Sequence, residues 1–144
     1  MSMVRKIGVV PFRMDQKTIS ILFITSMQRR RWIFPKGNLK KKESHKTGCL
    51  REAHEEAGVM GKVLKDFPMT FIMPARDHST GLSPVIYYPM LVENYAQTWP
   101  EEQHRNRQWM ALEDAIQDIA SRDILRVIKH FEKLKPWIVY ALDV

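Results

Sequence analysis

Three glutamates and an arginine crowd into the stretch REAHEEAG, residues 51–58. Glu52, Glu55 and Glu56 are spaced i, i+3 and i+4, so on a helix the three carboxylates would share one face. Like charges at this spacing repel by about 0.2–0.5 kcal/mol per pair. Magnesium would turn that repulsion into attraction, because it prefers hard oxygen ligands and binds through a few carboxylates plus substrate phosphates. The stretch indicates either such a metal site or a solvated acidic face in which Arg51 pairs with Glu55.

The residues around this stretch favour the metal site. Gly37 is followed by five residues and then Glu43, and seven more residues separate Glu43 from Arg51, before Gly58 ends the helix pattern. Written out, the pattern is G-(five)-E-(seven)-R-E-U-x-E-E-x-G-U, in which U is apolar. This pattern resembles the Nudix box at every defined position of residues 37–59.

The resemblance implies a metal-dependent pyrophosphohydrolase that uses Mg²⁺, with Mn²⁺ as a possible replacement. In such an enzyme water attacks phosphorus in a nucleoside diphosphate linked to another group, while metal ions neutralise the phosphate oxygens. Glu52 and Glu56 look like the family's metal ligands, and Glu55 matches the general base. The residues alone do not fix which glutamate is the base. Arg51 is expected to hold Glu43 or a helix carboxylate in place.

Two further segments narrow the resemblance to one branch of the family. RRWIFPKGNL and TWPEEQHRNRQWMALEDAI are similar to the diphosphoinositol polyphosphate and diadenosine polyphosphate hydrolases. In that branch, basic side chains from the first strand, the loop before the box and a late strand grip the phosphates. The matching candidates are Arg5, Lys6, Ser26, Arg76 and Arg107. Arg107 is the strongest of them, because it stands two residues before Trp109 in the matching segment and a guanidinium can hold two phosphate oxygens. Lys36 departs from the branch, where the inositol enzymes tend to have glycine.

Several alternatives stay open. An ADP-ribose or oxidised-nucleotide pyrophosphatase would share the same box. His45 and Cys49 at i, i+4, with His54 further on, suggest zinc, but they do not complete a tetrahedral site. A catalytically silent nucleotide- or RNA-binding module is suggested by RRR at 29–31 and KKK at 40–42, although no known nucleic-acid-binding pattern accompanies these runs. A silent module would be expected to lack a box glutamate, and none is missing.

The composition bounds the class of protein. Hydrophobic residues make up 44% of the chain and charged residues 27%, which is an ordinary globular balance. A length of 144 residues predicts a single domain over 1–144. The net charge of +7 suits a polyphosphorylated small-molecule substrate. One cysteine excludes an internal disulfide and predicts a cytoplasmic setting, and no apolar run is long enough for a membrane span. The oligomeric state is not indicated.

Apolar periodicity predicts the elements that position these residues. Strands are expected at residues 4–13, 18–26, 31–35, 62–74, 83–93 and 106–112. Residues 36–44 read as a polar loop, in which Gly37 lets the backbone approach the helix or the phosphates closely. A helix is expected from about Ser44 to Ala57, with Gly58 suited to follow its end. A core stripe is expected in the C-terminal helix at Ile124, Leu125, Ile128, Phe131 and Leu134. The order β-β-β-α-β-β-β-α-α predicts the α/β (α+β) class, a Nudix-like α/β/α sandwich with a central mixed sheet.

Overall fold

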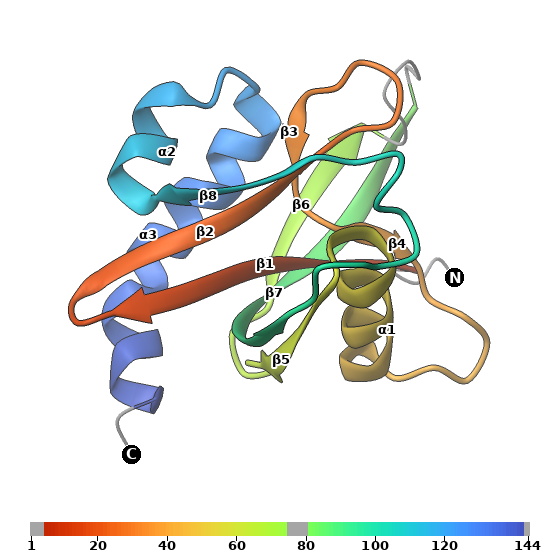
Figure 1. The fold of residues 1–144 in the computed structure, drawn as a ribbon. Helices are drawn as coiled ribbons and strands as arrows, with labels where there is room; N and C mark the ends of the chain where they lie inside the picture. The colour runs from red at the N-terminus through yellow and green to blue at the C-terminus, as the bar shows by residue number, and fades with distance from the viewer. Residues whose placement is uncertain (1–4, 75–80, 143–144) are drawn as a thin grey trace.

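The computed structural model describes residues 5–74 and 81–142. Within these residues one eight-stranded mixed sheet lies between helices (Figure 1), which confirms the expected sandwich. The strands are β1 (Lys6–Asp15), β2 (Thr18–Thr25), β3 (Trp32–Ile33), β4 (Lys36–Asn38), β5 (Val59–Val63), β6 (Met69–Pro74), β7 (Leu82–Tyr95) and β8 (Arg107–Ala111). The helices are α1 (His45–Glu52), the π-helical turn η1 (Ala53–Ala57), α2 (Leu112–Asp118) and α3 (Arg122–Leu142).

The sheet is organised around β1. Its main path runs in the order β3-β2-β1-β7-β5, while β4 pairs with β1, β6 with β7 and β8 with β2. β1 and β7 are parallel, from Lys6 opposite Val85 to Phe12 opposite Leu91, and the other pairs are antiparallel. A sheet that mixes both directions needs long connections between its parallel strands, and α1 is part of the connection between β1 and β7.

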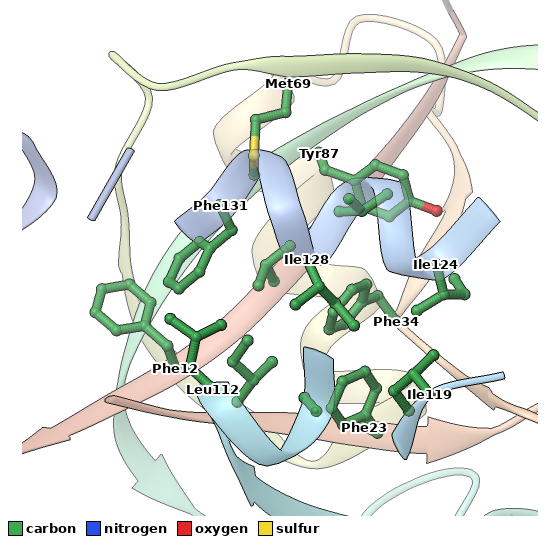
Figure 2. Close-up of a cluster of buried hydrophobic side chains, with 14 of the residues drawn as sticks. Phe12, Phe23, Phe34, Met69, Tyr87, Leu112, Ile119, Ile124, Ile128 and Phe131 are labelled. Carbon is green, nitrogen blue, oxygen red and sulfur yellow. The ribbon is translucent and has the colours of Figure 1, made fainter. Parts of the chain in front are cut away.

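Helices cover both faces of this sheet, so strand residues are buried on both sides. In β2, Ile21 and Phe23 face the core under α2 and α3, whereas Leu22 and Ile24 face the core under α1 and η1. Figure 2 shows the first of these cores, in which Phe23 lies with Phe34, Phe12 and Phe131. Burial on both faces explains why β2 reads as a nearly continuous apolar run rather than an alternating one.

The expected stripe of α3 packs into this core. Ile124, Ile128 and Phe131 are buried, and Leu134 is partly buried against them, whereas Leu125 is half-exposed. The stripe is therefore confirmed as core packing for most of its members. None of the described helices is long and apolar enough to cross a membrane.

Two element predictions are wrong. Residues 36–44 are not entirely loop, because β4 pairs Lys36 with Gly8 and Asn38 with Lys6. The strand predicted at 62–74 is divided between β5 and β6, with a turn at Lys65 and Asp66. Local residue preferences could not reveal either error. β4 contains no residue type that favours strands, and the run at residues 62–74 is apolar on both sides of its turn.

Candidate active site

The box helix begins and ends at the residues that cap it. The Ser44 hydroxyl accepts a hydrogen bond from the backbone N–H of Thr47 at 3.1 Å, as an N-cap residue does. At the other end Gly58 has φ of 66°, the left-handed conformation that glycine adopts without strain. Between these caps, α1 continues into η1, whose hydrogen bonds span one residue more than those of an α-helix.

The three glutamates of the box helix differ in their exposure to solvent. Glu52 and Glu56 are only 6% and 9% exposed, whereas the side chain of Glu55 is 39% exposed. In a wider turn each residue rotates by a smaller angle, so three residues fall further short of a full turn. Glu55 is therefore more open to solvent than Glu52 and Glu56, although Arg51 Nη1 bonds to the carboxylates of both Glu52 and Glu55.

Strand β4 lies directly against the two buried carboxylates. A Cβ atom added at Gly37 would overlap the carboxylate of Glu52, so only glycine leaves room for that side chain. The backbone N–H of Lys36, the preceding residue, donates to Glu56 Oε1 at 3.2 Å. The strand that the sequence did not predict thus forms one wall of the site.

Arg51 joins the loop before the helix to the helix itself. Its Nε donates to Glu43 Oε2 at 2.7 Å, and its Nη1 donates to Glu52 Oε2 at 2.6 Å and to Glu55 Oε1 at 3.4 Å. Arg51 therefore contacts both partners that the sequence suggested for it, Glu43 and a helix carboxylate. The hydrogen bond from Arg51 is the main reason that the pKa of Glu43 is lowered to about 2.

Glu56 is the most perturbed carboxylate of the site. Burial raises its pKa to about 8; the charge of Arg105 opposes this rise, and the charge of Glu52 adds to it. Arg105 is itself buried, with its Nη2 at 3.6 Å from Glu56 Oε2 and its Nε at 2.9 Å from Glu101 Oε1. A third bond, from Arg105 Nη1 to the carbonyl of Thr25 at 2.9 Å, fixes the guanidinium.

Sequence reasoning missed Arg105. Arg105 lies two residues before Arg107 in the same family-like segment, and residues two apart in an extended segment point to the same side, which is the signal that could have found it. The sequence could not show that Arg105 pairs with Glu56, because Glu56 lies far away along the chain.

The two buried carboxylates fit magnesium or manganese. Their charged forms lie side by side in a buried place, where a divalent cation would stabilise them, and carboxylate oxygens are the ligands that such ions prefer. Zinc does not fit equally well. Within residues 5–74 and 81–142 no group of three or more His, Cys, Asp and Glu side chains could hold an ion, which leaves zinc without its tetrahedral ligand set, whereas magnesium keeps several waters and binds through one or two carboxylates plus substrate phosphates. His45 Nδ1 is 2.8 Å from the Tyr88 hydroxyl, and burial raises the pKa of Cys49 to about 12.

The predicted phosphate-binding residues occupy different surroundings. The guanidinium of Arg107 lies between the rings of Tyr95 and Trp99, 3.8 Å from each ring centroid, and donates to the carbonyl of Ala57 at 3.0 Å. Burial lowers the pKa of Arg107. Arg107 thus contacts the box helix through its backbone, and its role in phosphate binding stays a prediction.

Among the remaining candidates, Arg5 and Lys6 contact the box through the backbone, because Leu39 N–H donates to the Arg5 carbonyl at 2.6 Å and Lys6 pairs with Asn38. Ser26 is buried, and its hydroxyl accepts a hydrogen bond from the backbone N–H of Arg31 at 3.0 Å. Arg5 is exposed just before β1, and Lys6 is half-buried at the start of β1. Arg76 lies outside the described residues.

A hollow of about 90 Å³ adjoins the carboxylates through Lys36. It is lined by Arg31, Ile33, Lys36, Met73, Pro74, Tyr87, Ser121, Asp123 and Ile124. The Tyr87 hydroxyl is buried there without a hydrogen-bond partner among the described residues. Such a group gains from a polar partner, so the hollow suits a ligand with both apolar and polar edges. Nothing in the sequence pointed to this hollow.

Comparison with known proteins shows which proteins this chain resembles. Residues 3–131 match the family model described as the NUDIX domain. Nudix hydrolase 16, mitochondrial, of Arabidopsis thaliana is 32% identical over 125 residues, which cover 76% of this chain and 69% of that protein. Diphosphoinositol polyphosphate phosphohydrolase 2 of Mus musculus is 29% identical over 126 residues, with coverage of 86% and 66%. The crystal structure of the C. elegans Ap4A hydrolase has a TM-score of 0.70 at 22% identity, covering 92% of this chain and 98% of that one, and so shows the same fold.

Proposed function

The chain belongs to the Nudix family, and we propose that it is a metal-dependent pyrophosphohydrolase that cleaves a phosphoanhydride bond in a polyphosphorylated small molecule. The observation that carries this proposal is the pair of buried carboxylates, Glu52 and Glu56, beside β4 at the end of the box helix. Two buried acidic side chains next to each other are costly to maintain, and a divalent cation would offset that cost.

Each residue of the site has a separate role in the proposed reaction. Glu52 and Glu56 would hold Mg²⁺ or Mn²⁺, which supplies positive charge to the phosphate oxygens. Glu55 is more exposed, so it can reach a water molecule and take its proton as the general base. Arg51 orients Glu52 and Glu55 through the bonds described above. Arg105 contacts Glu56 Oε2 while Lys36 N–H donates to Oε1, so both carboxylate oxygens have a partner that limits their movement.

The hollow supports a choice of substrate. Arg31 and Lys36 provide positive charge for phosphates near Glu56, whereas Asp123 and the apolar walls disfavour a ring that carries phosphates all round. A carboxylate and a buried hydroxyl suit the amino and ring nitrogen groups of a nucleobase. We therefore favour a diadenosine polyphosphate over a diphosphoinositol polyphosphate, two substrate classes that appear in the names of relatives. ADP-ribose and oxidised nucleotides are the alternatives.

A hydrolysis screen tests this choice. Diadenosine tetraphosphate, a diphosphoinositol polyphosphate, ADP-ribose and an oxidised nucleoside triphosphate are incubated with Mg²⁺ and with Mn²⁺, and the products are resolved by chromatography. We expect the highest kcat/KM for diadenosine tetraphosphate, and a selective loss on that substrate in Asp123→Asn. Preference for one of the other three would overturn the choice of substrate. Hydrolysis of none, by a folded protein that binds Mn²⁺, would leave the silent binding module.

We also propose a compartment and a domain organisation for the protein. The single cysteine favours a reducing compartment such as the cytoplasm, and the length favours one domain over residues 1–144.

A further inference from the structure

Four consecutive carbonyl groups at the end of the box helix accept hydrogen bonds from one distant segment, residues 96–107. This segment follows β7 and leads into β8, and it runs beside the helix in Figure 1. The bonds are Glu101 N–H to Glu55 O at 3.1 Å, Trp99 Nε1 to Glu56 O at 3.0 Å, Arg107 Nη1 to Ala57 O at 3.0 Å and Ala96 N–H to Gly58 O at 2.9 Å.

These bonds satisfy groups that a helix cannot satisfy alone. The last four carbonyl groups of a helix have no partner within it. Here the N–H of Gly58 turns back to the carbonyls of Ala53 and His54, and the 96–107 segment supplies the next four donors. Because the chain leaves as β5 immediately after Gly58, no later helical residue could supply them.

The same segment is itself rigidly fixed against the turn. The guanidinium of Arg107 is stacked between the rings of Tyr95 and Trp99, which limits its rotation. The side chain of Trp99 also lies against Gly58, where an added Cβ would be 2.8 Å from Trp99 Cβ. Two of the four donors are thus side-chain groups held in one orientation by their neighbours.

The geometry of the glutamates depends on this arrangement. A π-helical turn is rare and differs from an α-helical turn by one residue, which in an α-helix corresponds to about 100° of rotation. If the outside donors were lost, the turn could relax toward α-helical hydrogen bonding, and Glu55 and Glu56 would rotate around the helix. Donors from outside the helix therefore influence where the two carboxylates point.

We propose that Trp99 and Arg107 are positioning residues, which hold the π-helical turn and through it the carboxylates of Glu55 and Glu56. The proposal rests on the proposed function, because it concerns the geometry of that site. It gives Arg107 a task other than the phosphate contact that the sequence suggests. The two tasks differ in what they predict for metal binding and for substrates of different phosphate number.

Two conservative variants test the proposal. Trp99→Phe removes the N–H donor but keeps a ring for Arg107 to stack on, and Arg107→Lys keeps the charge but not the fork that bonds to Ala57. We expect each folded variant to bind Mn²⁺ more weakly and to lose kcat by about two- to tenfold for Trp99→Phe and about tenfold or more for Arg107→Lys. The losses should be equal on diadenosine tetraphosphate and on a substrate with fewer phosphates, with KM nearly unchanged. Amide hydrogen exchange in residues 53–58 should become faster.

The matched controls carry the same substitutions elsewhere. Trp137→Phe changes an exposed tryptophan of α3, and Arg13→Lys changes an arginine that stacks on the ring of Trp109 at 4.2 Å. Both should behave like the wild type. If Arg107→Lys does not fold, Trp99→Phe decides the question.

Other outcomes would overturn the proposal. Unchanged Mn²⁺ affinity and unchanged kcat in folded Trp99→Phe would contradict it. A rise in KM that grows with the number of substrate phosphates in Arg107→Lys would also contradict it. The latter would make Arg107 a phosphate contact. Mn²⁺ affinity and amide exchange do not require turnover, so they report on positioning even if the wild type hydrolyses none of the substrates, a result that would instead refute the proposed function.

Discussion

Glu52 and Glu56 turn into the protein, while Glu55 remains partly exposed on the same helix. This difference in burial separates the proposed tasks. A buried carboxylate next to another one is costly unless a cation or a proton neutralises it, and the raised pKa of Glu56 reflects that cost. A general base needs access to water, and Glu55 is the most exposed of the three glutamates.

Substitutions of two neighbouring glutamates should therefore have different effects. We expect Glu55→Gln to keep its Mn²⁺ affinity and melting temperature while kcat falls about a hundredfold or more, the scale of general-base catalysis. Glu56→Gln should lose Mn²⁺ affinity. Isothermal titration with Mn²⁺ and initial rates at saturating Mg²⁺ measure the two effects separately. Near-wild-type turnover of Glu55→Gln would transfer the role of base to another carboxylate.

At the scale of elements, Glu43 fastens the loop after β4 to α1. Its Oε1 accepts from the backbone N–H of Lys40 at 2.9 Å, and both of its oxygens accept from Arg51. These bonds favour the charged form of Glu43, which is why its pKa falls from 4.5 to about 2. A lowered pKa makes the stabilising contribution of a carboxylate depend on pH.

The sign of this dependence follows from the direction of the shift. The contribution of Glu43 is complete above its ordinary pKa of 4.5 and is lost as pH falls toward 2. We expect Glu43→Gln to lower the urea midpoint at pH 7, and the gap to the wild type to narrow between pH 4.5 and 2. Glu132→Gln, at an exposed position of α3, is the control and should show no such gap. A gap of constant size at all pH values would mean that Glu43 acts through packing alone.

The sequence predicted the sandwich, the box helix and the end of that helix before Gly58 because these depend on local patterns. Ser44 and Gly58 signal helix ends by residue type, and the apolar runs signal strands. What it could not predict depends on distant partners. β4 exists because β1 offers it a pairing edge, and Arg105 matters because Glu56 is nearby in space. The π-helical turn likewise depends on donors from residues 96–107.

At the scale of the whole molecule, the chain carries a net charge of +7, although its candidate site is built from acidic residues. The two charges serve different parts of the proposed reaction. The overall positive field attracts a polyphosphate, and the local negative charge of Glu52 and Glu56 attracts the divalent cation that must meet it. The sheet holds these parts together, because β4 and the segment before β8 contact the same helix end.

The central claim is that hydrolysis requires a divalent cation held by Glu52 and Glu56. The most direct measurement is the initial rate of diadenosine tetraphosphate hydrolysis, or of the best substrate of the screen, in excess chelator and after Mg²⁺ is restored, for the wild type beside Glu56→Gln. We predict no turnover in chelator, full recovery of the wild type with Mg²⁺, and little recovery of the variant. The melting temperature of the wild type should rise with Mg²⁺, because the ion binds the folded arrangement. Turnover that persists in excess chelator, recovery by zinc alone, or equal recovery of Glu56→Gln would contradict the claim.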